Sequence, residues 1–356
     1  MQKRLTFVTL LIVGALVLSF SLASAQEVGP ITQRIMDRGS LNCGGNQNLP
    51  GFGSLDDAGN FVGFDTDFCR AVAAAILGDA NAVNFRHVDA VDRQAVLQSG
   101  EIDMMARNTT WTLSRDVVWT ATFAPTTFYD GQGIMAKSEL GVSTIEELDG
   151  GSICVQTGTT TELNITDFIT ASGVEVGLNV FPDQPSSWDA YLAGRCDAFT
   201  TDKSGLLSLK AADSDPGAHF IFDVTLSKEP LGPLSPQSDP QFADIIAWTV
   251  YGLITAEESG ITSDNIGDFV QGEGESNEDY QARVGVDVAR LLGQAEQASG
   301  SYLGIPNDFM VSVIQQVGNY EEIFDRNLGP DTIFGLGRGV NALWTDGGLL
   351  YAPPFR

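Results

Sequence analysis

The sequence predicts an α/β protein folded as two lobes. Strand-like and helix-like segments alternate in the first third of the chain, where strands at 83–88 and 102–105 flank a helix at 91–99. This alternation favours a largely parallel sheet covered by helices, because parallel strands are joined by crossover connections. The chain has 356 residues, which is too long for one ordinary hydrophobic core and fits two.

The N-terminus has the three parts of a secretory signal peptide. Lys3 and Arg4 form a basic start, an apolar run follows at 5–20, and small residues at 23–25 supply a cleavage site. We therefore expect residues 1–25 to be removed. An anchored N-terminal helix is the alternative, but the apolar run falls short of the about 20 residues that span a bilayer. No Cys follows the cleavage site, which argues against a lipid anchor.

Acidic residues greatly outnumber basic ones. The sequence has 19 Lys and Arg against 46 Asp and Glu. Removing the signal peptide takes away Lys3 and Arg4 and no acidic residue, which leaves 17 basic and 46 acidic residues and a net charge of −29. This charge excludes a nucleic-acid surface as the main function. It does not bear directly on the binding of a small zwitterion.

Four cysteines remain after residue 25: Cys43, Cys69, Cys154 and Cys196. An even number in an oxidising compartment indicates two disulfides, although spacing alone allows three pairings. We expect Cys43–Cys69 and Cys154–Cys196, because each pair lies within one predicted lobe and would tie a strand to a nearby element. A metal site is the alternative, but the sequence has no C-x-x-C and only two histidines, so we expect no metal.

The first lobe is predicted to begin with a helix at 31–38 and a strand at 40–44. A glycine-rich loop at 46–53 follows this strand. Asp65 or Thr66 is expected to cap the next helix. The glycines do not form G-x-G-x-x-G between a strand and a helix, so the sequence predicts turns here and no nucleotide site.

A dense set of polar side chains follows the strand at 102–105. It consists of the loop 107–110 and of Arg115 a few residues later. Arginine offers a planar fork of donors, and small hydroxyl and amide groups complete the hydrogen bonds, so this set suits a carboxylate. The alternative is a solvated loop whose arginine pairs with a neighbouring Asp.

Two strand ends in the second half of the chain also carry polar residues. The strand at 153–155 leads to threonines 159–161, at the start of a helix that ends at Ile169. A helix N-terminus attracts anions through its free N–H groups and its dipole, although a threonine there can be only a cap. The segment 194–202 is expected to be a strand ending at Asp202, for which a plain helix cap is the alternative.

The remaining segments complete the second lobe and return the chain to the first. They are a strand at 176–181, a helix at 188–193, an extended connection at 227–233, and helices at 241–255, 279–292 and 309–319.

Several segments share their pattern with one known family. They are G-F-D-T-D at 63–67, N-T-T-W-T-L-S-R at 108–115, F-A-P-T-T-F-Y at 123–129, Q-T-G-T-T at 156–160 and G-R-C-D-A-F-T-T-D at 194–202. Together they resemble the periplasmic amino-acid-binding proteins of ABC transporters, solute-binding protein family 3. The segment K-E-P-L-G-P at 228–233 and the long C-terminal part further resemble the general L-amino-acid-binding branch.

The resemblance implies the type II fold of periplasmic binding proteins. Each lobe would be a mostly parallel sheet flanked by helices, and two hinge strands would join the lobes. Residues 26–131 would form the first part of lobe 1, residues 132–229 lobe 2, and residues 230–356 the return of lobe 1 with an extended C-terminal helical region.

The resemblance also implies what the protein does. It would be an exported, periplasmic monomer without a cofactor and without direct membrane insertion, and it would not be an enzyme. It would capture an L-amino acid between two closing lobes and deliver it to an inner-membrane ABC permease with its ATPase.

The family pattern also implies roles for individual residues. Arg115 would hold the ligand carboxylate with a bidentate grip, completed by Asn108 and Thr110 from lobe 1. Thr160 and its helix N-terminus would add contacts to the carboxylate from lobe 2. Asp202 would pair with the ligand ammonium.

Two departures from the family pattern concern the ligand side chain. Narrowly specific relatives often place an aromatic clamp in the first loop, where this sequence has Leu49, with Phe52 three positions later. Arg107 replaces a small polar residue and adds a charge near the pocket. Both changes fit a roomy or differently tuned pocket, and the branch resemblance implies broad L-amino-acid specificity.

An enzyme on the same scaffold is the main alternative function. Some relatives are periplasmic dehydratases that act on prephenate-like or arogenate-like substrates. An acid or base would then be needed, and the candidates Glu101, Asp130 and His87 lie in segments that we interpret as structural. No Ser/His/Asp or Cys/His set is recognisable. A sensory or structural interaction protein is a third possibility, and it would need a partner because no signalling domain is fused to the chain.

Overall fold

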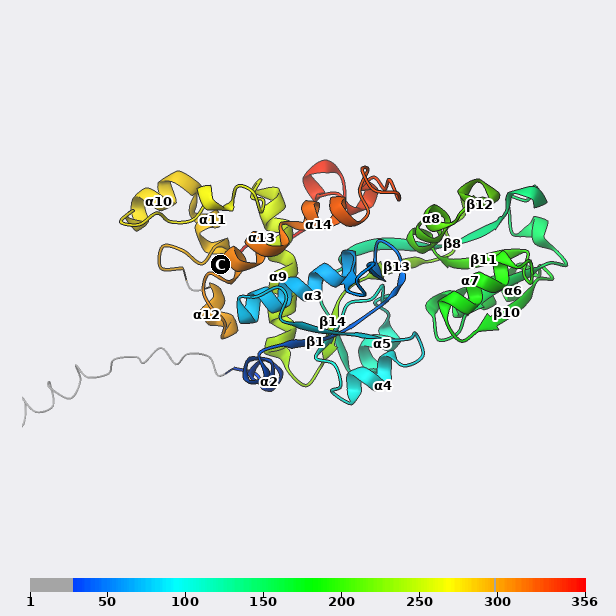
Figure 1. Ribbon diagram of the computed structural model, residues 1–356, viewed down its shortest axis with the longest axis horizontal. Helices are drawn as coiled ribbons and strands as arrows, with labels where there is room; N and C mark the ends of the chain where they lie inside the picture. Colours follow the sequence, from blue (N-terminus) through cyan, green and yellow to red (C-terminus); the bar gives the residue numbers. More distant parts are fainter. Residues whose placement is uncertain (1–27, 298) are drawn as a thin grey trace, which may run out of the picture.

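The computed structural model describes residues 28–297 and 299–356, so the predicted signal peptide lies outside the described residues. Within these two ranges, no helix is both long and apolar enough to cross a membrane. Figure 1 shows two sheet-containing parts side by side, which we call lobe 1 and lobe 2. In the C-terminal region, α10 (Asn277–Val284), α11 (Val286–Leu291) and α12 (Ser299–Leu303) lie beside lobe 1, on the side away from lobe 2.

Lobe 1 is built on a five-stranded sheet with the strand order β5-β1-β6-β14-β7. Its members are β1 (Leu41–Gly45), β5 (Val83–His87), β6 (Met104–Met105), β7 (Ala121–Phe123) and β14 (Leu234–Pro236). β1 is parallel to β5 and β6, whereas β14 is antiparallel to β6 and β7. A small antiparallel sheet accompanies it, made of β2 (Asn48–Leu49), β3 (Gly53–Leu55) and β4 (Phe61–Val62).

Lobe 2 is built on a second mixed sheet with the order β10-β9-β11-β8-β12. Its members are β8 (Phe128–Lys137), β9 (Ser152–Gln156), β10 (Gly177–Phe181), β11 (Ala198–Asp202) and β12 (His219–Ile221). β9, β10 and β11 are parallel, and β8 runs antiparallel to β11 and β12. Each sheet therefore has three neighbouring parallel strands, then one antiparallel strand (β14 or β8), and an outer strand (β7 or β12) that pairs antiparallel with it.

Two extended segments connect the lobes. The first part of β8 pairs antiparallel with β13 (Lys228–Leu231), and the second part of β8 pairs with β11 and β12 inside the lobe 2 sheet. β8 carries the chain into lobe 2, and β13 carries it back toward β14. The paired connection is the expected arrangement of two hinge strands.

Helices cover both sheets. In lobe 1 they are α2 (Pro30–Arg38), α3 (Phe64–Leu77), α4 (Arg93–Gln98), α5 (Leu113–Val118) and α9 (Pro240–Glu258). In lobe 2 they are α6 (Thr160–Ser172), α7 (Gln184–Leu192) and α8 (Lys203–Ala212). The C-terminal region adds α10 (Asn277–Val284), α11 (Val286–Leu291), α12 (Ser299–Leu303), α13 (Phe309–Val317) and α14 (Tyr320–Asn327).

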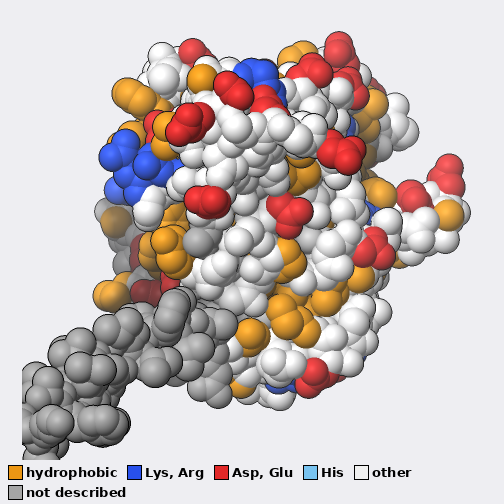
Figure 2. Space-filling model, turned by 90° about the vertical axis from the view of Figure 1, so that its left-hand side faces the viewer, with side chains coloured by type: hydrophobic (Ala, Val, Ile, Leu, Met, Phe, Trp, Pro, Cys, Tyr) orange, Lys and Arg blue, Asp and Glu red, His pale blue; other side chains and the backbone are white. Residues whose placement is uncertain are grey.

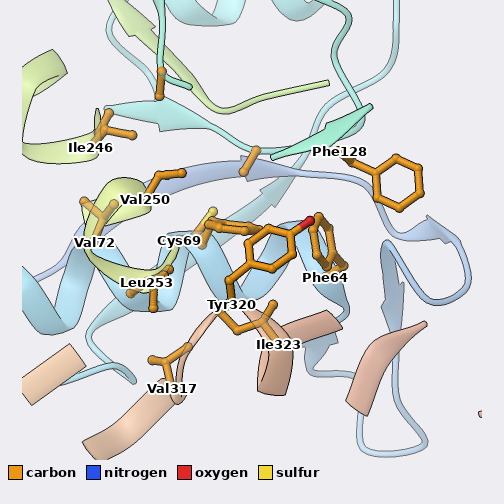
Figure 3. Close-up of a cluster of buried hydrophobic side chains, with 14 of the residues drawn as sticks. Phe64, Cys69, Val72, Phe128, Ile246, Val250, Leu253, Val317, Tyr320 and Ile323 are labelled. Atoms are coloured by element: carbon orange, nitrogen blue, oxygen red, sulfur yellow. The ribbon is translucent and has the colours of Figure 1, made fainter. Parts of the chain in front are cut away.

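The C-terminal helices α13 and α14 complete the core of lobe 1. Tyr320 and Phe324 of α14 pack edge-on against Phe64 of α3, with ring centres 5.8 Å and 6.3 Å from it. Figure 3 shows Tyr320 and Phe64 among other buried side chains of this cluster. The Tyr320 hydroxyl donates to the carbonyl oxygen of Thr127, immediately before β8, at 2.6 Å. Burying such large aromatic groups stabilises the fold, so α14 belongs to the core and supports the start of the hinge.

Both predicted disulfide pairings are confirmed. Cys43 of β1 is bonded to Cys69 of α3, and Cys154 of β9 is bonded to Cys196, just before β11. Each bond ties a strand to a nearby segment of its own lobe. Among the described residues no cysteine is free.

Several predicted boundaries are wrong for local reasons. Asp65 and Thr66 do not cap α3, because the helix already begins at Phe64, after Gly63, and has no side-chain cap. The helix predicted at 279–292 is broken into α10 and α11 at Gly285, where φ is 87°. Glycine adopts this conformation without the steric cost that other residues meet.

Acidic side chains are scattered over the face of the molecule that Figure 2 shows, and the basic ones gather in a few places on it. This distribution agrees with the strongly negative sequence, which has 46 acidic against 19 basic residues.

Candidate functional site

A small cavity lies between the lobes, near the carboxyl ends of parallel strands from both sheets, where α/β sheets commonly bind ligands. The loop after β6 reaches it from lobe 1, and the ends of β9 and β11 reach it from lobe 2. It is lined by Leu49, Arg93, Arg107, Asn108, Thr110, Arg115, Gln156, Thr159, Thr160, Thr161, Gln184, Thr201 and Asp202. Its volume is about 30 Å³, so the two walls lie close together.

The loop after β6 is held by the buried carboxylate of Asp65 in α3. Asn108 has a left-handed backbone conformation, with φ of 37°, which asparagine tolerates better than most residues. Its N–H donates to Oδ2 of Asp65 at 2.5 Å. Burial raises the pKa of Asp65 to about 7. α3 thereby fixes the loop that carries Arg107, Asn108 and Thr110.

Arg115 lies in the first turn of α5, where the side chain of Thr112 caps the helix by accepting the Arg115 N–H at 3.2 Å. Its Nη1 donates to the carbonyl oxygen of Thr110 at 2.9 Å, and its guanidinium lies 5.2 Å from the ring centre of Trp119. Burial lowers the pKa of Arg115, and the carboxylate of Glu229 opposes this shift. The other donors of the guanidinium make no hydrogen bond to the described residues and are available to an anion in the cavity.

Two further arginines of lobe 1 line the same cavity. Arg93 donates from Nε to the carbonyl oxygen of Ala90 and from Nη2 to that of Gly158 in lobe 2, both at 3.0 Å. Arg107 is 5% exposed, yet its guanidinium forms no hydrogen bond or ion pair within the described ranges, and its Nε is fully buried. Burial lowers the pKa of Arg107 to about 10, which leaves it charged at neutral pH.

The start of α6 forms part of the lobe 2 wall. Thr159 is its N-cap and accepts the N–H of Glu162 at 3.1 Å. Thr160, the next residue, lies with its hydroxyl 3.3 Å from the hydroxyl of Thr110 in lobe 1. The N-terminus of a helix of 13 residues presents free N–H groups and a positive dipole end to the cavity.

Glu229 of β13 does not line the cavity but holds side chains of this wall by hydrogen bonds. It is 1% exposed and accepts hydrogen bonds from Thr160 Oγ1 at 2.8 Å, from Asn164 Nδ2 at 2.9 Å and from Ser227 Oγ at 2.5 Å. The hydroxyl proton of Thr160 is therefore directed to Glu229. A hinge residue thus orients the helix start that faces the ligand space.

Two more carboxylates lie near Glu229. Asp130 of β8 accepts hydrogen bonds from the N–H groups of Gly131 at 2.8 Å and Ser204 at 3.3 Å. Burial raises the pKa of Asp130 to about 6. Burial, and next the charges of Asp130 and Glu229, raise the pKa of Asp202 well above its ordinary value.

Asp202 lies at the end of β11 and is 6% exposed. Although it occupies the N-cap position of α8, its side chain makes no capping hydrogen bond. It also makes no other hydrogen bond or ion pair within residues 28–297 and 299–356. A cation in the cavity would meet an unpaired carboxylate that lies near two further carboxylates.

The structure brings seven of the eight residues predicted for the ligand site to the cavity. They are Leu49, Arg107, Asn108, Thr110, Arg115, Thr160 and Asp202.

Phe52 is the predicted site residue that the structure places elsewhere. It is fully buried, with its ring edge-on to Phe64 at 5.9 Å and to Phe128 at 5.1 Å. It does not line the cavity between the lobes. Phe52 therefore supports the loop that carries Leu49 and leaves the wall of the cavity to other residues.

Several lining residues are not predicted from the sequence. They are Arg93, Gln156, Thr159, Thr161, Gln184 and Thr201. Arg93 lies in a helix that the pattern does predict, but nothing in that pattern shows the side chain crossing to lobe 2. The K-E-P-L-G-P segment contains Glu229, but its prolines and glycine predict only an extended connection.

The chain matches a model of the bacterial extracellular solute-binding proteins, family 3, over residues 41–327. It is 44% identical over 345 residues to the general L-amino acid-binding periplasmic protein AapJ of Rhizobium johnstonii, covering 97% of each chain. It is 41% identical over 343 residues to the glutamate/glutamine/aspartate/asparagine-binding protein BztA of Rhodobacter capsulatus, covering 96% of this chain and 98% of that protein.

Solved structures agree with these sequence matches. A periplasmic binding protein of an ABC transporter from Brucella ovis, with glutathione bound, superposes with a TM-score of 0.85 and 43% identity. The superposition covers 91% of this chain and 99% of that one. An ancestral arginine-binding protein bound to arginine superposes with a TM-score of 0.53 and 28% identity, covering 60% of this chain and 91% of that one.

Proposed function

The chain belongs to the bacterial extracellular solute-binding proteins of family 3, and we propose that it binds L-amino acids between its two lobes for delivery to an ABC transporter. The two-lobed α/β fold and the family predicted from the sequence are confirmed. The relatives described above are named as binding proteins, so the chain is a transport receptor, and the dehydratase alternative finds no support.

The observation that carries the ligand class is the separation of charge in the cavity. Arg115 has unused donors on one side, beside the N-terminus of α6. Asp202 has an unpaired carboxylate on another side. A molecule with a carboxylate and an ammonium on the same carbon atom satisfies both groups, because each buried ion gains a partner of opposite charge. An α-amino acid has this arrangement.

We assign the contacts as the family pattern implies. Arg115 holds the carboxylate with a bidentate grip, Asn108 and Thr110 complete its hydrogen bonds, and the N-terminus of α6 at Thr160 adds donors from lobe 2. Asp202 accepts the ammonium protons. Glu229 is a positioning residue here, because it orients the Thr160 hydroxyl and does not line the cavity.

Ligand contacts from both lobes explain how binding closes the molecule. A ligand that touches both walls binds the closed form more tightly than the open one and shifts the population toward it. The small cavity of about 30 Å³ corresponds to a closed arrangement. The closed form of the loaded protein then docks on an inner-membrane permease with its ATPase.

The cellular setting follows from the same assignment. The protein acts in the periplasm as a monomer, after cleavage of the signal peptide at residues 1–25. Broad specificity is supported by the similarity to the general L-amino acid-binding protein and by Leu49, which places no aromatic clamp in the cavity. The domain limits stay as the sequence suggests, with lobe 1 at 26–131 and 230–356 and lobe 2 at 132–229.

Calorimetric titration of the mature, ligand-stripped protein tests this function. The panel contains L-amino acids, with their D-enantiomers and prephenate as controls. We expect binding of several L-amino acids at micromolar concentrations or below, without chemical change of the ligand. Absence of binding to every L-amino acid of the panel, or turnover of prephenate, would overturn the proposal.

The Arg115→Met variant tests the carboxylate contact. We expect it to weaken binding of every L-amino acid by about 1.5–3 kcal/mol, the usual range for hydrogen bonds to charged groups. Arg86→Met is the matched control, because Arg86 is an exposed arginine of the same lobe. A loss of less than about 1 kcal/mol in Arg115→Met would show that the carboxylate binds elsewhere.

A further inference from the structure

Arg107 is a buried cation for which the contacts assigned above provide no partner. It lines the cavity and is 5% exposed. Its Nε is fully buried without a hydrogen-bond partner, and its guanidinium makes no ion pair among the described residues. Burying a charged group without a partner costs several kcal/mol. A group of this kind is expected where a ligand supplies the missing partner.

The nearest carboxylates of lobe 1 are engaged elsewhere. Asp65 accepts the N–H of Asn108 at 2.5 Å. Asp89 lies with Oδ1 3.1 Å from Nε2 of His87. Both attract Arg107 electrostatically, but neither is within hydrogen-bond or ion-pair distance of it. Arg107 is therefore not the partner of a structural carboxylate.

Arg107 and Arg115 line the same cavity, and the charge of Arg115 contributes to lowering the pKa of Arg107. Two guanidinium groups in one cavity need two acceptors. Because the α-carboxylate of the ligand is assigned to Arg115, the acceptor for Arg107 has to come from another part of the ligand, which is its side chain.

Two amide side chains of lobe 2 line the same cavity. Gln156 ends β9 and Gln184 begins α7. Neither side-chain amide makes a hydrogen bond to another described residue, and both line the cavity with Arg107. A guanidinium and two amides offer several N–H donors, and this set suits a planar carboxylate or carboxamide.

We propose that Arg107 forms a subsite for a carboxylate or carboxamide at the end of the ligand side chain. This proposal rests on the proposed amino-acid-binding function. The protein then prefers acidic L-amino acids and their amides over aliphatic ones of similar size. The acidic ligands bind most tightly, because they add an ion pair to the hydrogen bonds. Aliphatic ligands leave Arg107 unpaired when the lobes close.

The wild-type protein provides the first test. L-Glutamate, L-glutamine and L-norleucine are titrated into the ligand-stripped protein, because norleucine has a comparable side-chain length and no acceptor. We expect glutamate and glutamine to bind at least tenfold more tightly than norleucine. Equal affinities for the three would overturn the subsite. Absence of binding by any amino acid would instead overturn the proposed function on which the subsite rests.

The Arg107→Met variant provides the second test. It keeps a long side chain and removes the charge and the donors. We expect the tenfold preference to fall to less than about threefold, with norleucine affinity unchanged or improved. Equal weakening of all three ligands would assign Arg107 to the common amino-acid contact and overturn the side-chain subsite.

A stability measurement separates a ligand role from a structural one. Because Arg107 has no partner in the protein, the ligand-free Arg107→Met variant should melt no lower than the wild type. A marked drop in its melting temperature would show that Arg107 supports the fold and would count against the proposal. If the Met variant does not fold, Arg107→Lys and the wild-type affinity ratios decide the question. Arg107→Lys should keep the preference for glutamate over norleucine but lose part of the preference for glutamine, because lysine lacks the planar fork.

Discussion

The two walls of the cavity differ in the sign of the charge they carry and in how they hold it. Lobe 1 supplies the guanidinium groups of Arg93, Arg107 and Arg115. Lobe 2 supplies Asp202, and the hinge strands add carboxylates close behind it. Each wall keeps one ion without a partner among the described residues, namely Arg107 on one wall and Asp202 on the other.

This difference shows why the site requires a ligand with separated charges. Attraction between the walls favours closure, and Arg93 already donates to the carbonyl oxygen of Gly158 across the gap. Closure without ligand leaves Arg107 without an anionic partner and Asp202 without a cation, which is unfavourable. A zwitterion removes that cost, so ligand and closure stabilise each other.

The largest effect is expected when the acidic wall loses its unpaired ion. In Asp202→Asn the ligand ammonium has no carboxylate partner and stays buried in the closed form. Breaking a buried charge pair usually costs about 2–5 kcal/mol, so affinity should fall by at least thirtyfold for every amino acid. Calorimetric titration measures this loss. Asp167→Asn is the control, because Asp167 is an exposed residue of the same lobe. Equal affinities of the two variants would mean that Asp202 does not bind the ammonium.

The pH dependence of affinity sharpens the comparison between the walls. The pKa of Asp202 is raised in the ligand-free cavity by burial and by its acidic neighbours, and the pKa of Asp130 is raised to about 6. An ammonium favours the ionised carboxylates and lowers these pKa values, so binding releases protons and affinity rises with pH. A single proton limits the rise to about tenfold per pH unit.

Titrations between about pH 5 and pH 8, each repeated in buffers of different ionisation enthalpy, count the protons released. The expected slope is positive in the wild type and much smaller in Asp202→Asn. Proton uptake on binding would contradict the assignment of the ammonium to this wall.

Glu229→Gln is expected to weaken binding by a smaller amount that is the same for every ligand. The amide keeps one acceptor oxygen but turns N–H donors toward side chains that now donate to Glu229. Thr160 then loses its orientation, and binding should weaken by about 1–1.5 kcal/mol. Because Glu229 does not line the cavity and acts through Thr160, the ranking of ligands should not change. A changed ranking in a panel titration would show that Glu229 contacts the ligand side chain.

The smallest effect is expected from Arg93→Met. The variant loses a hydrogen bond that joins the lobes at 3.0 Å, a contact of about 0.5–1.5 kcal/mol. The ligand-free protein should open further, and affinity should change little. Small-angle scattering of the ligand-free protein would record a larger radius of gyration than in the wild type. An unchanged radius together with a large loss of affinity would make Arg93 a ligand contact.

The sequence predicts the parts of this site that lie within one motif. Arg115, Thr160 and Asp202 each follow a strand end or begin a helix, and local patterns expose such positions. Glu229 and Arg93 escape prediction because their roles depend on distant partners, Thr160 and Gly158. Phe52 is expected near the ligand because it is an aromatic residue of the first loop, but core packing decides where its ring lies.

The fold also has parts that local sequence patterns predict and parts that depend on contacts between distant residues. Alternating strands and helices are predictable because the period of a pattern is a local property, and the cysteine pairs are predictable because each pair lies within one predicted lobe. The break at Gly285 is a one-residue backbone event inside an otherwise helical pattern. The role of α14 in supporting the hinge depends on the aromatic contacts of Tyr320 with α3 and on its hydrogen bond to Thr127, which no local pattern reveals.

The central claim is that one ligand must satisfy both charged walls. The most direct measurement is titration of the ligand-stripped wild type with an L-amino acid that it binds, with the amide of its α-carboxylate, and with its analogue lacking the α-ammonium. Each analogue should bind at least tenfold more weakly than the parent amino acid, because each leaves one wall unpaired. If either analogue bound as tightly as the parent, the two-wall account would be contradicted.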